Sequence, residues 1–120
     1  MTNLSIKKII FYFLILTLIF LLDRFSKLYI LNLADINGVV DIYINSFLNI
    51  ILVWNTGIGF GLLSFDESSI YNIITFFITL INVVILYLVF KSNNFKSYFF
   101  IMILGGSLGN LFDRIYYSAV

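Results

Sequence analysis

Residues 70–90 read IYNIITFFITLINVVILYLVF, a run of 21 residues without a charged side chain. At 1.5 Å per residue, a helix of this length extends about 31 Å, which matches the thickness of the hydrocarbon core of a bilayer. We therefore predict a transmembrane helix at about residues 69–90, ended by the short polar segment KSNNFK at 91–96.

Two further apolar segments flank this helix. Upstream, residues 9–22 carry no charge, and apolar residues continue past a charged cluster at 23–27, which predicts a helix at about 8–30. No small-residue cleavage site follows this run, so we interpret it as a membrane span and not as a signal peptide. Downstream, residues 97–112 are uncharged, and a third helix is predicted at about 97–117.

The composition supports a membrane protein. Of the 120 residues, 62% are hydrophobic and only 11% are charged, whereas soluble domains are nearer one half and one quarter. A water-soluble globule and a disordered chain are therefore excluded. The net charge of +1 gives no attraction for a polyanion, so no nucleic-acid partner is expected. The chain lacks Cys and His, which excludes thiol and imidazole chemistry. We expect no metal and no cofactor.

The lysines predict the orientation in the membrane. Lys7 and Lys8 precede the first helix, and Lys91 and Lys96 separate the second from the third. With three spans these lysines share one side, which the positive-inside rule assigns to the cytoplasm. The N-terminus is therefore expected in the cytoplasm and the connection at about 31–66 on the outer surface.

That connection is predicted to be more than a loop. Residues 50–54 (IILVW) are β-prone, and Asn55, Thr56 and Gly57 are typical of a turn. We predict a small extracytoplasmic β-like platform at about 31–66. The fold class is then an all-α multi-pass membrane protein, with residues 1–120 forming one integral membrane domain.

Polar residues inside the spans indicate a site. A charge at mid-helix costs about 2.5–3.5 kcal/mol on insertion scales, so each needs a reason. Asp23 and Lys27 lie four residues apart, and Asn110 shares a helix face with Asp113 and Arg114. At helical rise, Asp23 and Asp113 lie about 21 and 24 Å from the cytoplasmic side, close to the level expected for the turn at Asn55.

Spacing alone leaves the role of these residues open. Asp23 could pair with Lys27 and Asp113 with Arg114, in which case both pairs would be structural. Gly105 and Gly109 form a small-xxx-small pair that packs helices, and Gly106 is expected to widen the gap for a neighbouring backbone. On this argument a hydrolase and a transporter are both possible.

The same segments resemble the lipoprotein signal peptidase (signal peptidase II) family. DRFSK at 23–27 is similar to the family's Asp-x-x-Ser-Lys, and NTGIGFG at 55–61 is similar to Asn-x-Gly-x-Ala-Phe-Gly. GGSLGNLFDR at 105–114 matches Gly-Gly-x-x-Gly-Asn-x-x-Asp-Arg. The motifs occur in the family's order and cover nearly the whole chain. Gly59 departs from the pattern, because the family usually has Ala there.

The resemblance implies a four-helix aspartic endopeptidase of the bacterial inner membrane, with its active-site side facing outward. Its partners would be diacylglyceryl-modified prolipoproteins, whose signal peptides it removes, and membrane lipid. We expect a monomer. Carried over by motif, the residues that bind substrate or support the site are Asp23, Lys27, Asn55, Gly57, Asn110, Asp113 and Arg114.

The two catalytic aspartates of the family belong to two later signatures, Val-x-Asp-Phe and Phe-Asn-x-Ala-Asp. Val120 stands where the Val of the first signature falls. We therefore expect a C-terminally truncated member that lacks both catalytic aspartates and the fourth helix and is inactive as a 120-residue chain. The alternatives are a small multi-helix transporter subunit and a non-catalytic membrane protein that binds lipopeptides.

Overall fold

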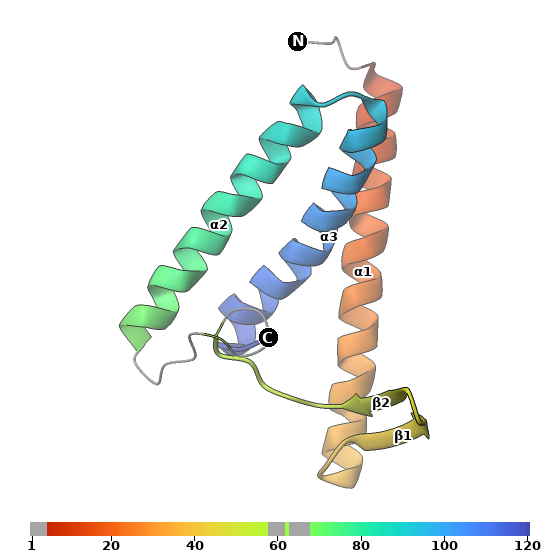
Figure 1. The fold of residues 1–120 in the computed structure, drawn as a ribbon, viewed down its shortest axis with the longest axis vertical. Helices are drawn as coiled ribbons and strands as arrows, with labels where there is room; N and C mark the ends of the chain where they lie inside the picture. The colour runs from red at the N-terminus through yellow and green to blue at the C-terminus, as the bar shows by residue number, and fades with distance from the viewer. Residues whose placement is uncertain (1–4, 58–61, 63–67) are drawn as a thin grey trace.

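The computed structural model of this chain describes residues 5–57, 62 and 68–120. The described part contains three helices and a two-stranded antiparallel sheet between the first and the second helix (Figure 1). Each helix is long and apolar enough to cross a bilayer. These findings confirm the predicted fold class. The elements are α1 Ile6–Asn37, β1 Asp41–Asn45, β2 Leu48–Ile51, α2 Ser68–Lys91 and α3 Asn94–Tyr117.

The first helix is longer than the sequence predicted. Its predicted end near residue 30 is wrong, because α1 continues to Asn37. Residues 31–37 contain neither Gly nor Pro, and the helix ends only at Gly38, which adopts φ 74° and donates its N–H to the carbonyl of Ala34 at 2.8 Å. With 32 residues, α1 extends about 48 Å, so its last turns project beyond a hydrocarbon core of about 30 Å.

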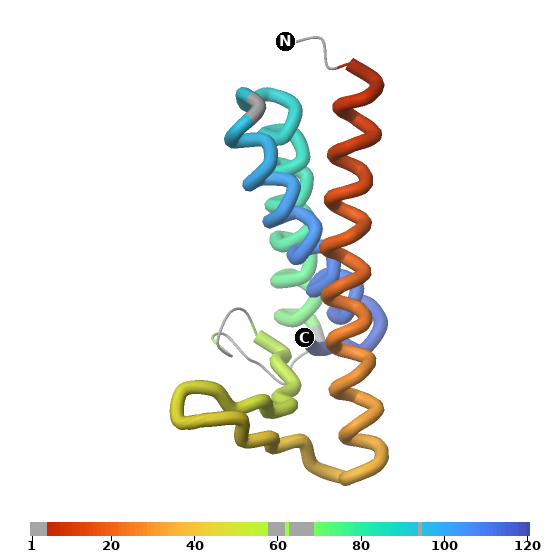
Figure 2. Tube along the Cα trace, turned by 90° about the vertical axis from the view of Figure 1, so that its right-hand side faces the viewer, coloured from red at the N-terminus to blue at the C-terminus, as the bar shows by residue number. Residues whose placement is uncertain are grey.

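The third helix is central to the packing. α3 packs against both α1 and α2, whereas α1 and α2 do not contact each other within the described residues (Figures 1 and 2). The buried core is small and is contributed by Tyr12, Val89, Ile101 and Leu104. Most other large apolar side chains of the helices are exposed, as expected for surfaces that face lipid.

Two glycines of α3 allow its close approach to α1. A Cβ atom on Gly105 would lie 3.0 Å from Ile19 Cβ and 3.2 Å from the carbonyl oxygen of Leu16. A Cβ on Gly109 would lie 2.7 Å from the carboxyl carbon of Asp23. The predicted packing role of these two glycines is confirmed.

Gly106 does not share this packing role. Among the residues that the structure describes, no atom lies within 4 Å of the position that its Cβ would occupy. The expectation that Gly106 makes room for a neighbouring backbone is therefore wrong, because this face of α3 points into open space.

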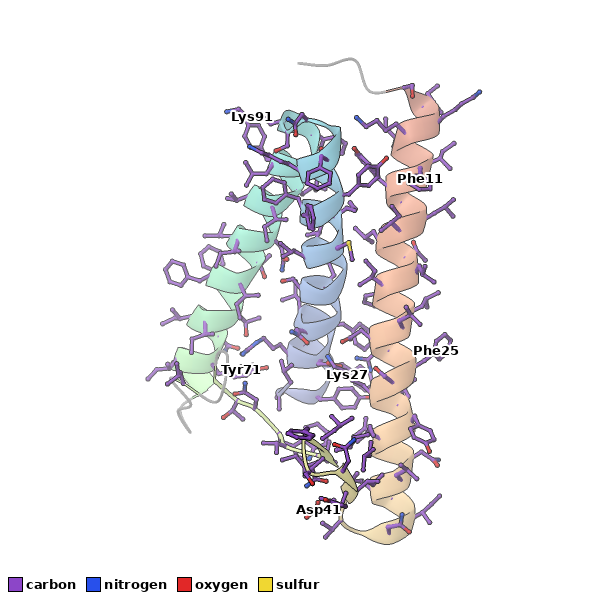
Figure 3. The ribbon with its side chains drawn as sticks, turned by 45° about the vertical axis from the view of Figure 1, so that its right-hand side comes forward. Phe11, Phe25, Lys27, Asp41, Tyr71 and Lys91 are labelled. Carbon is purple, nitrogen blue, oxygen red and sulfur yellow. The ribbon has the colours of Figure 1, made fainter. Side chains whose placement is uncertain are left out.

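The connection between α2 and α3 lies at the same end of the helices as the N-terminus (Figure 1). Lys91, labelled in Figure 3, is at this end, and Lys7 and Lys8 begin α1 there. The lysines used for the orientation thus cluster at one end, as the sequence predicted. We call the opposite end, where α1 ends and the β-strands lie, the hairpin end.

The platform is a β-hairpin followed by an irregular segment. β1 and β2 pair with Ile42 opposite Ile50 and Tyr43 opposite Asn49, and the register shifts between residues 43 and 45. Because α1 occupies residues up to 37, the platform begins later than the predicted residue 31. Its last part, including Gly59, Phe60 and Gly61 of the second motif, lies outside the described residues.

Candidate functional site

Asp113 is the centre of a buried ionic cluster between α1 and α3. One of its carboxylate oxygens accepts a hydrogen bond from Arg24 Nη1, and the other accepts one from Lys27 Nζ at 2.6 Å. Asp113 is 4% exposed and Arg24 is 8% exposed. A buried carboxylate needs such partners, since removing an unpaired charge from water is costly.

Lys27 connects the two helices through several partners. In addition to Asp113, its ammonium donates to Asn110 Oδ1 at 2.7 Å and forms an ion pair with Asp23 Oδ1 at 3.0 Å. An ammonium group has three N–H donors, so these three oxygens match its full donor capacity. The first and third sequence motifs therefore meet at Lys27.

The pairing of these charges differs in part from the simplest sequence interpretation. The ion pair between Asp23 and Lys27 is confirmed. A pair between Asp113 and Arg114 is wrong, because Asp113 binds residues of α1 while the Arg114 side chain reaches the platform. Adjacent residues of a helix do not face each other, which explains the separation.

Arg114 joins the platform to α2 and α3. Its Nη2 donates to the carbonyl oxygen of Gly57, and the hydroxyl of Tyr71 donates to the Arg114 carbonyl oxygen at 2.9 Å. The Arg114 guanidinium also lies 5.4 Å from the centre of the Tyr71 ring. Arg114 is 4% exposed, and its Nη1 has no hydrogen-bond partner among the residues that the structure describes. Figure 3 shows Tyr71 and Lys27 at similar heights along the helices.

Asn55 holds the turn of the platform. Its side-chain oxygen accepts a hydrogen bond from the N–H of Gly57 at 2.8 Å, which is the local contact that favours Asn in turns. Its backbone exchanges two hydrogen bonds of 2.8 Å with Val120. The Trp54 and Tyr117 rings also contact each other, with centroids 6.0 Å apart. The second motif is thereby attached to the end of α3.

All seven residues that the sequence proposed for the site lie in this region, although in two groups. Asp23, Lys27, Asn110 and Asp113 form the ionic cluster between α1 and α3. The second group joins the platform to α3, with Arg114 bonded to Gly57 and Asn55 holding the turn that contains it. This group consists of Asn55, Gly57 and Arg114.

Two residues of the site were not predicted. Arg24 is held against Asp113, and its guanidinium lies 4.6 Å from the centre of the Phe112 ring. The sequence carried a signal for Arg24, because a cation within a membrane span needs a partner, and Arg24 is such a cation just as Lys27 is. Tyr71 donates a hydrogen bond to the Arg114 carbonyl oxygen, and its ring lies near the Arg114 guanidinium. Its position at the start of an apolar helix gave no signal.

A pocket of about 230 Å³ lies beside the ionic cluster. Its polar part is formed by Ser26, Lys27 and Asp113, and its remaining lining is mostly apolar. This lining comes from α1, β2, the segment after β2, and the end of α3 with the residues that follow it. Pockets with a few polar groups in an apolar lining are typical of ligand sites. The geometry suits an amphiphilic ligand whose polar group lies near Lys27. Among the described residues, no cluster could hold a metal ion.

The fold and the site define a class: a multi-pass membrane protein with a buried ionic cluster and an amphiphilic pocket at one end of its helices. Comparison with known proteins narrows this class. The family model for signal peptidase (SPase) II matches residues 15–120. The chain belongs to the signal peptidase II family, and this membership together with the three apolar helices indicates a peptidase of a bacterial membrane.

Several curated relatives carry the name lipoprotein signal peptidase. The protein of Pelagibacter ubique is 48% identical over 120 residues, covering 100% of this chain and 72% of the relative. That of Anaplasma marginale is 34% identical over 107 residues, covering 88% and 61%. That of Francisella tularensis subsp. novicida is 35% identical over 113 residues, covering 91% and 69%. No solved structure matches this chain.

Proposed function

We propose that this chain forms the substrate-binding part of an intramembrane aspartic endopeptidase that removes signal peptides from diacylglyceryl-modified prolipoproteins. The observation that carries the proposal is the meeting of the first and third sequence motifs at one pocket, through Lys27 and Asp113. The second motif is joined to the third by the contact of Arg114 with Gly57. The names of the relatives support the substrate class.

The pocket has the chemistry that such a substrate requires. A diacylglyceryl-modified prolipoprotein carries long acyl chains next to polar backbone groups. The apolar lining, which includes Leu31, Leu52 and Trp54, suits the chains. The polar part near Lys27 and Asp113 suits the peptide groups.

The site residues then have distinct roles. Lys27 and Asp23 polarise and shape the pocket from α1, while Asn110 and Asp113 brace it from α3. Asn55 and Gly57 form the turn of the platform, and Arg114 holds this turn through its hydrogen bond to the Gly57 carbonyl oxygen. The buried Nη1 of Arg114 gives the site a further donor close to the platform.

Location and orientation complete the proposal. We place the chain in the bacterial inner membrane as a monomer, with the N-terminus in the cytoplasm and the hairpin end outward. The lysines at the end opposite the hairpin support this orientation, because positive residues are retained on the cytoplasmic side. A transporter subunit is less well supported, since Asp23 and Asp113 are both ion-paired and Asp113 lies nearer the hairpin end of α3 than its middle.

A chimera tests the proposed function. Residues 1–120 are joined to the segment of the Pelagibacter ubique relative that follows the matched region. The chimera and the 120-residue chain are each incubated with a diacylglyceryl-modified prolipoprotein, and cleavage is followed by the change in electrophoretic mobility. We expect the chimera to cleave and the 120-residue chain to leave the substrate intact, because the family's two catalytic-aspartate signatures are not present in residues 1–120.

Two controls accompany the cleavage assay. The relative itself serves as the positive control, and an unmodified prolipoprotein, without the diacylglyceryl group, serves as the negative substrate. A well-folded chimera that cleaves nothing while the relative cleaves would contradict the proposed function. Cleavage by the 120-residue chain alone would contradict the assignment of the catalytic aspartates.

A further inference from the structure

The β1–β2 hairpin exposes more apolar surface than a water-facing element does. Between residues 38 and 57 the chain carries one charged residue, Asp41. Ile44 and Leu48 are 49% and 51% exposed, and Phe47, in the turn between the strands, is 98% exposed. An exposed apolar patch of this kind marks a surface that meets a partner or a membrane.

The hairpin has one mostly apolar face and one more polar face. Successive side chains of a strand point to opposite sides, and residues paired across the strands share a side. Ile42 pairs with Ile50, and their neighbours on that side are Ile44 and Leu48. The other side carries Asp41, Tyr43, Asn49 and Ile51, with a hydrogen bond of 2.8 Å from Asn49 to Asp41. Asn45 pairs with Leu48 beyond the register shift and lies at the turn end of the apolar side. This division suits a boundary between an apolar and a polar medium.

The position of the hairpin corresponds to the edge of the bilayer. The strands run crosswise to α1 and lie beside its last turns, beyond the ends of α2 and α3 (Figures 1 and 2). In both views the turn between the strands extends outside the area that the helices occupy. An element that extends sideways from membrane-spanning helices at this level lies over the surrounding lipid.

We infer that the β1–β2 hairpin is a membrane anchor, with Phe47 and the face formed by Ile42, Ile44, Leu48 and Ile50 immersed in the interfacial region of the leaflet at the hairpin end. Amphipathic elements in this position lie about 5–10 Å into the boundary between headgroups and acyl chains. The inference concerns the bilayer alone and does not depend on the proposed peptidase function.

Lipid fits this surface better than a protein partner does. Ile36, in the last turn of α1 just before the strands begin, is 72% exposed, so both elements expose apolar side chains in this region. Residues 38–57 contain no Lys or Arg, so attraction to anionic lipid makes no contribution. The anchor is therefore expected to insert equally well into zwitterionic and anionic bilayers.

Single-cysteine labelling tests the anchor, because the chain has no native Cys. A polarity-sensitive fluorophore is attached to Phe47→Cys, to Ile44→Cys on the apolar face, and to Tyr43→Cys, the matched control on the polar face. Each labelled protein is placed in phosphatidylcholine vesicles at high lipid-to-protein ratio. We expect blue-shifted emission at positions 44 and 47, quenching by lipids spin-labelled near the headgroup, and protection from aqueous iodide. At position 43 we expect emission typical of water and strong iodide quenching.

Two results would overturn the inference. The first is iodide quenching at positions 44 and 47 as strong as that at 43, without quenching by spin-labelled lipid. The second is protection at 44 and 47 that disappears as the lipid-to-protein ratio rises, since this would indicate contact with a second copy of the chain. Fluorescence of Trp54, the single tryptophan of the chain, reports whether each variant keeps the fold at the contact with Tyr117.

Discussion

Replacing Asp113 with asparagine is expected to lower the free energy of unfolding by about 3–5 kcal/mol, the cost of removing one partner from a buried ion pair. The Asp113 carboxylate accepts hydrogen bonds from Arg24 and Lys27. Asparagine has no negative charge, so the substitution leaves both cations between α1 and α3 without this anionic partner. Stability is measured as the midpoint of unfolding by sodium dodecyl sulfate in mixed micelles, followed by Trp54 fluorescence. The same substitution in the chimera is expected to abolish cleavage.

Asp41→Asn is the matched control for this substitution. Asp41 is an exposed carboxylate of the hairpin, outside the cluster, so its replacement is expected to change stability by less than about 0.5 kcal/mol. If the two substitutions had equal effects, Asp113 would not have the central position in the cluster that the contacts assign to it.

Replacing Gly109 with alanine is expected to separate α1 from α3. The added Cβ would lie 2.7 Å from the carboxyl carbon of Asp23, so the Asp23 side chain has to move, and its ion pair with Lys27 is disturbed. Overpacking of this kind costs about 1–3 kcal/mol. Because Asp23 is the residue displaced, we also expect the chimera carrying this variant to lose cleavage activity. The unfolding midpoint and the cleavage assay measure these effects.

Gly106→Ala provides a close control, because it adds the same methyl group to the same helix. Within the described part of the chain, no atom lies within 4 Å of this position, and alanine has the higher helix propensity. Stability is expected to be unchanged or slightly increased. Equal losses at positions 106 and 109 would indicate that helix propensity, and not contact with Asp23, governs the result.

The helical part of the fold was predictable because hydropathy is a local property. The uncharged run at 70–90 fixed α2 to within two residues at either end. The end of α1 was not predictable in this way. Asn32 and Asp35 lower the local hydropathy, but a helix that extends past the hydrocarbon core needs no uninterrupted apolar run, and α1 ends only at Gly38.

The candidate site was predictable as a set of residues but not as a set of contacts. The cost of burying charge identified Asp23, Lys27 and Asp113 from the sequence. The partner of Asp113 depends on which face of α3 meets α1, and this is decided by the close approach at Gly105 and Gly109.

The contacts of Arg24 and Tyr71 also depend on which helix faces pack together. Arg24 pairs with a residue 89 positions away, and Tyr71 binds a carbonyl group 43 positions away. Sequence spacing within one helix cannot reveal such pairs, because they form only when separate helices pack together.

The central claim is that Lys27 of α1 and Asp113 of α3 interact directly and so join two sequence motifs into one site. A double-mutant cycle tests this claim most directly. Lys27→Met, Asp113→Asn and the double variant are compared with the native chain by the free energy of unfolding in mixed micelles. Residues in contact through an ion pair are expected to show a coupling energy of about 0.5–3 kcal/mol. Additive effects of the two substitutions, with no coupling energy, would contradict the account.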